Sequence, residues 1–363
     1  MKSIDRSLLL ITGTLVVFGF FIFTSASLGL LAREGAKFSS VAFSQIFFGM
    51  FLGTIFLFIM TKIKYRLWKP LALYIFIFSL IGTALVFVPG VGFELNGARR
   101  WIHILGFSIQ PAEFLKLGFV IYLASYLSDA RNKITEYKHG LIPFAVILGI
   151  PSILLLLQPD TGTVLVLASA GVAMYITVGG KARDLLILFV IAVITVGALV
   201  YQRPYLRDRL ETYISPGTNL QESGYQLNQS LIAVGSGGIF GRGFGQSVQK
   251  FNYLPEPIGD SIFAVAAEEF GFVGAVLLVF TFLAFSFRGL KIASHSPDYF
   301  SGLLVVGIVI LIISQSFINI GSMLGVFPLT GLPLLFISHG GTAMLFALGS
   351  VGIVLNISKY IKS

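Results

Sequence analysis

The 363-residue chain contains no cysteine and few charged residues. The absence of cysteine excludes disulfides, thiolate metal sites and cysteine nucleophiles. Charged residues make up 11% of the chain and hydrophobic residues 56%, whereas a soluble domain is typically about 25% charged. The composition therefore excludes an ordinary soluble globular protein.

The hydrophobic residues occur in long uninterrupted runs, and about 20 apolar residues are enough to cross the hydrocarbon core of a bilayer. We predict an all-α integral membrane protein, a bundle of about ten transmembrane helices that forms a single domain over residues 1–363. The first run is interpreted as a membrane helix because no cleavage site for a signal peptide follows it. The runs are approximately 8–31, 41–61, 71–89, 111–128, 141–157, 161–178, 185–201, 261–287, 301–323 and 342–357.

The basic residues are distributed unevenly between the segments that join these runs. With the N-terminus inside, the inside segments hold more Lys and Arg than the outside segments, and such residues concentrate in cytoplasmic loops. Both termini are therefore predicted to be cytoplasmic. The net charge of +9 follows from this bias and from attraction to anionic lipids, so no nucleic-acid partner is predicted.

One long segment, residues 202–260, separates the seventh run from the eighth and is predicted to be a large, ordered extracytoplasmic loop. It contains the glycine-rich stretch 235–245, which suits close approach of the backbone to a ligand. The stretch matches neither a P-loop nor a dinucleotide fingerprint, so no nucleotide is predicted. The four histidines of the chain lack the spacing of metal ligands on a helix, and no metal-ligating residue is predicted.

Ionisable side chains inside predicted membrane helices are candidate functional residues because they are costly in lipid. Glu113 and Lys116 begin the fourth run, and their i, i+3 spacing places them on one helical face. They form either a structural ion pair or a site in which Lys116 attracts an anionic ligand. Asp160 precedes the sixth run and either caps that helix or serves a site.

Two arginines, Arg99 and Arg100, fall at the predicted outer membrane surface beside Trp101. The guanidinium fork matches the geometry of phosphate, whereas an interfacial tryptophan is ordinary anchoring. These arginines therefore either bind a phosphate-bearing lipid head group or are solvated at the interface.

The densest group of acidic residues surrounds the start of the eighth run. Glu256 and Asp260 precede it, and Glu268 and Glu269 follow about two turns later. Two adjacent glutamates are costly in a lipid-facing helix, so at least one is predicted to face the bundle interior or a wet cavity. Asp260 is either a helix cap or a functional carboxylate.

Several short motifs occur in order along the chain and together resemble the SEDS family (shape, elongation, division and sporulation). The stretches 249–257 and 328–333 favour its cell-division branch, FtsW, over its elongation branch, RodA. The motifs are Asn-Gly-Ala-Arg-Arg-Trp-Ile (96–102), Gln-Pro-Ala-Glu-Phe-Leu-Lys (110–116), Gln-Pro-Asp-Thr-Gly-Thr (158–163), Gly-Tyr-Gln-Leu-Asn-Gln-Ser-Leu-Ile-Ala-Val-Gly-Ser-Gly-Gly (224–238), Gly-Arg-Gly-Phe-Gly (241–245), Leu-Pro-Glu-Pro (254–257) and Pro-Leu-Leu-Phe-Ile-Ser-His-Gly-Gly (333–341).

This resemblance implies a peptidoglycan glycosyltransferase that polymerises lipid II into glycan strands and releases undecaprenyl pyrophosphate. The family works beside a class B penicillin-binding protein, an FtsI-like transpeptidase, and the division branch works with divisome proteins at the septum of the bacterial inner (plasma) membrane. The essential aspartate of the family corresponds to Asp260, which is therefore predicted to be the catalytic base.

The sequence departs from the family pattern at two places. The family has His-Thr-Asp-Phe where this chain has Ile-Gly-Asp-Ser (258–261), and Ser-Tyr-Gly-Gly-Ser-Ser where it has Ser-His-Gly-Gly-Thr-Ala (338–343). These changes bear on acceptor binding more than on the reaction.

The remaining candidate residues are predicted to bind substrate or to support the site. The leaving pyrophosphate needs positive charge, for which Lys116, Arg99, Arg100 and Arg242 are candidates; a divalent cation, Mg or Mn, is expected by family analogy only. The predicted substrate-binding residues are Glu113, Lys116, Arg99, Arg100, Arg242, Glu256 and Ser338, and the supporting residues are Asp160, Glu268 and Glu269.

Three alternatives remain at this level: a lipid II flippase, an elongation polymerase of the RodA type, and a scaffold for division proteins. A flippase needs a polar path through the bilayer, whereas an enzyme needs its polar cluster on one face. The ionisable candidates lie toward the outer ends of the runs, which favours the enzyme.

Overall fold

The computed structural model describes residues 3–33, 35–95, 98–104, 107–202, 204–214 and 223–361. A helical stretch occupies each of the predicted apolar runs. The second run is divided into α2 (Gly35–Phe43), the π-helix η1 (Ser44–Leu52) and α3 (Gly53–Lys62). The others are α1 (Arg6–Arg33), α4 (Trp68–Ala84) between the short 3-10 helices η2 (Tyr65–Leu67) and η3 (Leu85–Phe87), α5 (Pro111–Ala130) followed by η4 (Arg131–Lys133), α6 (Leu141–Leu157), α7 (Thr161–Thr177), α8 (Ala182–Gln202), α12 (Ile262–Ser294), α13 (Tyr299–Met323) and α14 (Gly341–Ser358).

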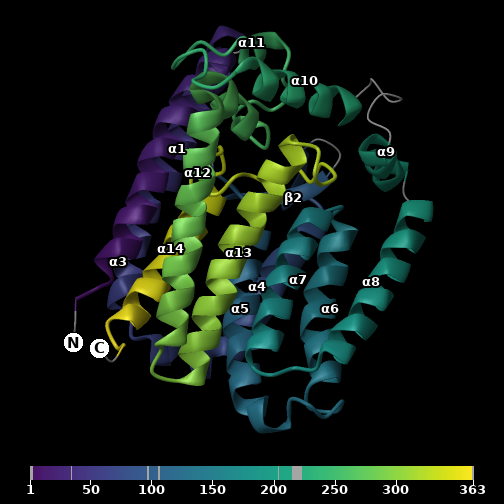
Figure 1. Cartoon of the computed structure of the whole chain (residues 1–363). Coiled ribbons are helices and arrows are strands. Elements are labelled where there is room, and N and C mark those ends of the chain that lie inside the picture. The colour runs from purple at the N-terminus through teal and green to yellow at the C-terminus, as the bar shows by residue number, and fades with distance from the viewer. Residues whose placement is uncertain are drawn as a thin grey trace.

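These helices run roughly parallel to one another in a single bundle (Figure 1). Within the described residues, seven helical spans are long and apolar enough to cross a membrane, while α6 and α7 are apolar but shorter, at 17 residues each. Both chain termini lie at the same end of the bundle (Figure 1). The chain is therefore a multi-pass membrane protein, as predicted.

The centre of the bundle is formed by α13 and α14. Of their most apolar 18-residue windows, 78% and 89% are buried, against 6% for α8. The glycine at position 307 lets α13 approach α5 and α7 closely, since a Cβ there would lie 2.5 Å from Val120 Cγ1 and 2.6 Å from Met174 Sδ. Small residues serve this purpose at helix contacts in membranes.

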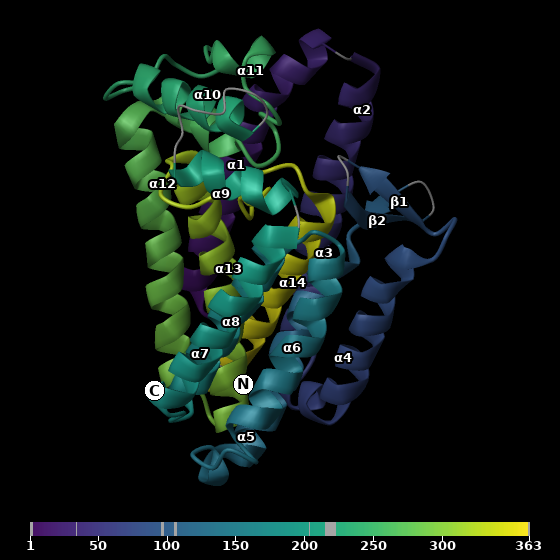
Figure 2. The same cartoon turned by 90° about the vertical axis from the view of Figure 1, so that its right-hand side faces the viewer.

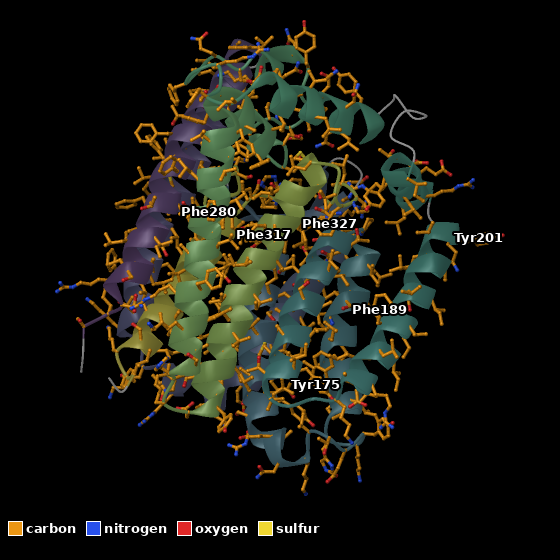
Figure 3. All side chains as sticks on the ribbon, viewed as in Figure 1. Tyr175, Phe189, Tyr201, Phe280, Phe317 and Phe327 are labelled. Carbon is orange, nitrogen blue, oxygen red and sulfur yellow. The ribbon has the colours of Figure 1, made fainter. Side chains whose placement is uncertain are left out.

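The helix α8 stands at the edge of the bundle (Figures 1 and 2). Its Phe189 is 65% exposed, and Figure 3 shows this ring on the outside of the bundle, whereas Tyr175 of α7 is buried in the interior. An apolar helix with so little protein contact has lipid around most of its surface.

A small antiparallel sheet, not predicted from the sequence, lies near the end of the bundle opposite the termini (Figure 2). It consists of β1 (Gly92–Leu95), β2 (Ala98–Ile104) and β3 (Phe107–Ile109) in the order β1-β2-β3, and Phe93 pairs with Trp101 across the first two strands. The predicted helical membrane fold is confirmed, and this small sheet went unpredicted because strands of three to seven residues give a far weaker sequence signal than a membrane helix.

The described parts of the predicted outer loop contain three helices together with turns and cover the same end of the bundle (Figure 1). They form α9 (Pro204–Ile214), α10 (Ser223–Ser236) and α11 (Gln249–Asn252). Of these, α10 packs on α12 and α13, which places the loop directly over the ends of the central helices.

Candidate functional site

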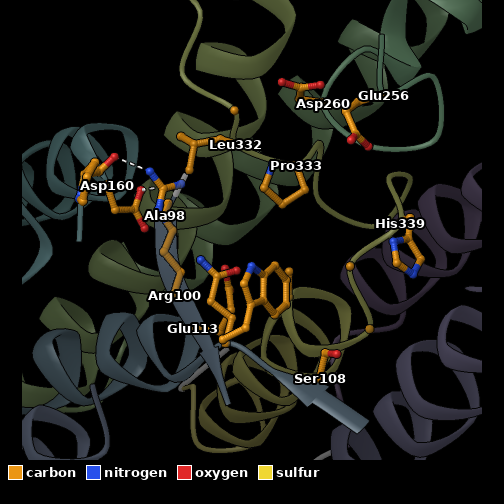
Figure 4. A pocket seen from close by; sticks show the side chains of 18 of the residues that line it. Ala98, Arg100, Ser108, Glu113, Asp160, Glu256, Asp260, Leu332, Pro333 and His339 are labelled. Carbon is orange, nitrogen blue, oxygen red and sulfur yellow. Dashed lines mark hydrogen bonds and ion pairs between the residues drawn. The ribbon is translucent and has the colours of Figure 1, made fainter. Parts of the chain in front are cut away.

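A cavity of about 1160 Å³ is hollowed into this end of the bundle. Its walls come from the sheet, from the ends of several membrane helices, from α9 and α10, and from the segments before α12 and before α14 (Figure 4). The predicted site residues that line it are Arg100, Glu113, Asp160, Glu256 and Asp260.

Asp260 lies on the cavity wall, and its side chain and its backbone are each held by a hydrogen bond. Its Oδ1 accepts a hydrogen bond of 3.1 Å from Gln226 Nε2 of α10. Its backbone carbonyl accepts one of 2.7 Å from Asn319 Nδ2 of α13. The N-cap of α12 is Ser261, without a side-chain capping bond, so the interpretation of Asp260 as the cap of this helix is not supported.

The surroundings of Asp260 shift its acidity toward neutral pH. Burial raises the pKa of Asp260 to about 6; the hydrogen bond from Gln226 and the charge of Arg209 lower this pKa, while the charge of Glu256 raises it. A carboxylate with such a pKa is ionised at pH 7 and still basic enough to accept a proton, which is what a general base requires.

The neighbouring Glu256 is held in a tight turn that leads to Asp260. Its φ of 44° is in the left-handed region, which is uncommon for a residue other than glycine. Pro257 follows it and disfavours the right-handed helical conformation, and the Glu256 carbonyl accepts hydrogen bonds from the backbone N–H groups of Gly259 (2.9 Å) and Ser261 (3.3 Å). The turn thereby fixes Glu256 and Asp260 on the same wall.

On another wall, Arg100 joins the sheet to the turn between α6 and α7 (Figure 4). Its Nε donates to the carbonyl of Gln158 at 3.0 Å, Nη2 donates to the carbonyl of Pro159, and Nη1 lies 3.9 Å from Asp160 Oδ1. Asp160 also caps α7, accepting hydrogen bonds from the Thr163 backbone N–H and hydroxyl. The capping interpretation of Asp160 is confirmed, and the same residue faces the cavity.

The pair Glu113 and Lys116 is a buried ion pair with an N–O distance of 2.8 Å. Lys116 also donates to Gln315 Oε1 of α13 at 2.5 Å, and Gln315 in turn donates to the carbonyl of Pro333. Glu113 lines the cavity, whereas Lys116 does not. The predicted ion pair is therefore confirmed, and its lysine does not line the cavity.

Both glutamates of α12, Glu268 and Glu269, are buried in the protein rather than exposed to lipid. Glu268 accepts hydrogen bonds from Ser247 Oγ and from the N–H groups of Val248 and Gln249. Glu269 Oε1 lies 2.7 Å from Lys250 Nζ, a side chain with no exposed surface. These two carboxylates lie outside the cavity lining and fix the segment 247–250 onto α12.

Three other predicted binding residues also have protein partners outside the lining. Arg99 is exposed and pairs with Glu94 at 3.3 Å, and Arg242 lies 3.5 Å from Glu268. The hydroxyl of Ser338 accepts a hydrogen bond from the backbone N–H of Leu334. None of these three residues, nor Lys116, lines the cavity, and the substrate roles predicted for them stay predictions.

The lining residues that the sequence prediction missed include Arg209, Gln226 and His339. Arg209 is near Asp260, because a Cβ at Gly331 would lie 3.9 Å from Arg209 Nη2 and 4.0 Å from Asp260 Oδ2. Gln226 and His339 stand inside two of the family motifs, which was an available signal; Arg209 lies outside all of them.

The imidazole of His339 points into the pocket (Figure 4) and stacks on Phe23 of α1. Burial lowers the pKa of His339 to about 4, so the ring is neutral at pH 7. In the part of the chain that the structure describes, its Nε2 has no hydrogen-bond partner. The His339 backbone N–H donates to the carbonyl of Ile258 at 2.7 Å, which ties this segment to the turn before Asp260.

The described residues contain no group of three or more His, Asp or Glu side chains that could hold a metal ion. The divalent cation expected by family analogy stays a prediction.

Comparison with known proteins shows similarity over the whole chain. A family model described as cell cycle protein, FtsW/RodA/SpoVE, matches residues 5–363. Stage V sporulation protein E of Bacillus subtilis (strain 168) is 38% identical over 361 residues, which cover 99% of this chain and 98% of that protein. The probable peptidoglycan glycosyltransferase FtsW of Trichlorobacter lovleyi is 35% identical over 365 residues, covering 100% and 95%.

Solved structures agree with this relationship. One similar chain comes from a peptidoglycan synthase complex studied for the coordination of polymerization and crosslinking; it has a TM-score of 0.81 and 27% identity, covering 98% of each chain. The rod shape determining protein RodA of Thermus thermophilus has a TM-score of 0.72 and 26% identity, covering 99% of this chain and 98% of that one. The chain belongs to the FtsW/RodA/SpoVE family.

Proposed function

We propose that this protein is a peptidoglycan glycosyltransferase that polymerises lipid II at the outer leaflet, with Asp260 as the general base. The observation that carries the proposal is the carboxylate of Asp260, held on the wall of the large cavity by Gln226. The FtsW relative is named a probable peptidoglycan glycosyltransferase, which supports the same reaction class.

The reaction is a single displacement. The 4-hydroxyl of the acceptor GlcNAc attacks the anomeric carbon of the donor MurNAc, and Asp260 takes the hydroxyl proton as the new C–O bond forms. The bond between the anomeric carbon and the diphosphate oxygen breaks, and undecaprenyl pyrophosphate leaves with that electron pair. The α-linked donor becomes a β-linked product, so no covalent enzyme intermediate is required.

The cavity suits two lipid-linked sugars in size and position. Ligand pockets usually measure about 300–1,000 Å³, and this one measures about 1160 Å³. Leu199 of α8 is part of its lining, and α8 is largely surrounded by lipid, so the cavity borders the region in which a prenyl chain lies. We assign Arg100 and Arg209, the two arginines among the described lining residues, to binding the leaving diphosphate. Their positive charge would stabilise the developing anion.

The location of the cavity favours an enzyme over a flippase. The lining residues on membrane helices include Glu113 and Thr161, at the first turns of α5 and α7, and Leu156, at the last turn of α6. All three positions are at the end of the bundle that carries the sheet. A flippase requires a polar path to the other end, where α7 and α6 instead pack Tyr175 on Phe144 at a ring distance of 4.8 Å.

The test is polymerisation of lipid II by the purified full chain, alone and with its transpeptidase partner. Asp260→Asn preserves the shape of the side chain but removes the base, so we expect glycan-strand formation to fall roughly 10²–10⁴-fold. Asp208→Asn, an exposed aspartate of α9, is the matched control and retains the parental rate. A parental rate for Asp260→Asn would show that the base is misassigned.

The cellular role follows as a finer proposal: septal synthesis during division, beside a class B penicillin-binding protein, with both termini cytoplasmic. The similarity to a chain from a peptidoglycan synthase complex supports such a partner, and the FtsW relatives support division. A fluorescent fusion tests this role: we expect septal bands, whereas an even lateral distribution would favour an elongation role.

A further inference from the structure

The network around Asp260 extends beyond the proposed base to Gln226 and Ser261. The two residues lie 35 positions apart in the sequence, Gln226 on α10 and Ser261 at the N-cap of α12. Gln226 Nε2 lies 3.1 Å from Asp260 Oδ1 and 3.0 Å from Ser261 Oγ. An amide nitrogen carries two hydrogens, so Gln226 donates to both oxygens at once.

The hydroxyl of Ser261 completes a triangle of hydrogen bonds. Ser261 Oγ accepts from Gln226 and lies 3.5 Å from Asp260 Oδ1, a distance at which it donates at most a weak hydrogen bond to that oxygen. Ser261 is fully buried, which leaves its hydroxyl with these neighbours rather than bulk water. Asp260 Oδ1 is therefore approached by the Gln226 amide and, at longer range, by the Ser261 hydroxyl, and the bond between these two groups fixes their relative positions.

The elements that carry these donors are themselves fixed. Ser230 of α10 is buried against Met323 of α13, with Oγ 3.4 Å from Sδ, which seats α10 on the bundle. Asn319 of α13 donates to the Asp260 carbonyl and to the Leu332 carbonyl, both at 2.7 Å. The backbone of Asp260 is thus held by α13 while its side chain is held by α10.

On this basis we infer that Gln226 and Ser261 are positioning residues that hold the Asp260 carboxylate in the orientation needed to accept the proton of the acceptor hydroxyl. The inference rests on the proposed function and explains a departure from the family pattern. Serine at position 261 replaces the phenylalanine of the family, and its hydroxyl supplies the second donor of the triangle.

A positioning role predicts a change in rate together with a change in pH dependence. The groups that face Asp260 are Glu256 in its own segment, Arg209 of α9 and the Gln226 amide of α10. Glu256 raises the pKa of Asp260, and the other two lower it. Removing the amide bond therefore raises the pKa of Asp260 and moves the acid limb of the pH profile upward.

The experiment compares Gln226→Met and Ser261→Ala with the parental full chain in lipid II polymerisation between pH 5 and pH 8. Methionine keeps the length of glutamine and removes both donated bonds. We expect kcat to fall about tenfold with KM within about twofold of the parental value, and the acid limb to move up by roughly one pH unit, the effect of one charge-assisted hydrogen bond. Ser261→Ala moves both quantities in the same direction by less.

Gln229→Met is the control for the pH profile, because it makes the same substitution on α10 at a residue that does not line the cavity. Its acid limb stays at the parental position. A merely structural role for Gln226 would lower the yield of active protein without moving the limb, and that result would overturn the inference. If Gln226→Met is not recovered as folded protein, the acid limb of Ser261→Ala decides the question.

Asp260→Asn, measured in parallel, separates the two levels of the proposal. If Asp260→Asn is inactive while Gln226→Met and Ser261→Ala show the parental kcat and pH profile, the positioning role is wrong and the proposed base stands. If Asp260→Asn polymerises lipid II at the parental rate, the base assignment fails, and the positioning role fails with it.

Discussion

The rate of lipid II polymerisation should depend on pH through the ionisation of Asp260. Burial of this side chain raises its pKa to about 6, so about 90% of the carboxylates are ionised at pH 7, about half at pH 6 and about a tenth at pH 5. Only the ionised form accepts a proton, and the rate should therefore fall about tenfold between pH 7 and pH 5. An aspartate with an ordinary pKa of about 3.9 would remain more than 90% ionised at pH 5.

The appropriate assay measures initial rates of glycan-strand formation over this pH range at several lipid II concentrations. The value of kcat/KM reports the pKa of the free enzyme, which is the state that the structure describes. We expect a plot of log kcat/KM against pH to rise with a slope of one below pH 6 and to level off above it.

Two charge-removing substitutions test the direction in which neighbouring charges shift the pKa of Asp260. Arg209 lowers the pKa of Asp260 and Glu256 raises it, so Arg209→Gln should move the acid limb to higher pH and Glu256→Gln to lower pH. Opposite shifts from two residues on the same wall are not expected from a general loss of folding. A flat profile down to pH 5, or an upward shift in Glu256→Gln, would refute the reasoning.

Two further changes test the parts of the structure that surround the site. Lys250→Met breaks the buried pair with Glu269 and leaves a buried carboxylate without its cation, at a cost of about 3–5 kcal/mol, which should lower the Tm in detergent by about 5–10 °C. The double variant Lys250→Met/Glu269→Gln should recover most of this loss. An unchanged Tm in the single variant would contradict the stabilising role of the pair. His339→Phe keeps an aromatic ring beside Phe23 and removes the unpaired nitrogen, so the Tm should not fall. The KM for lipid II should rise about tenfold if the imidazole of His339 hydrogen-bonds a neutral sugar group. An unchanged KM would exclude that contact.

The sequence by itself determined which segments cross the membrane. Each crossing is encoded locally in a run of about 20 apolar residues, so helices such as α13 (Tyr299–Met323) could be placed without any knowledge of their neighbours. The cap at Asp160 was predictable for the same reason, since its partner Thr163 is three residues away. The acidic residues at the start of α12 were recognised as candidates because charge is rare in such a helix.

Only the tertiary structure decided which polar groups share the cavity. Gln226 reaches Asp260 from 34 residues away because α10 packs across the ends of α12 and α13. Lys116 is directed away from the cavity by Gln315, which is 199 residues distant in the sequence. Hydrogen bonds and ion pairs act over about 3 Å in space, and the spacing of residues along the chain does not indicate which helices come that close.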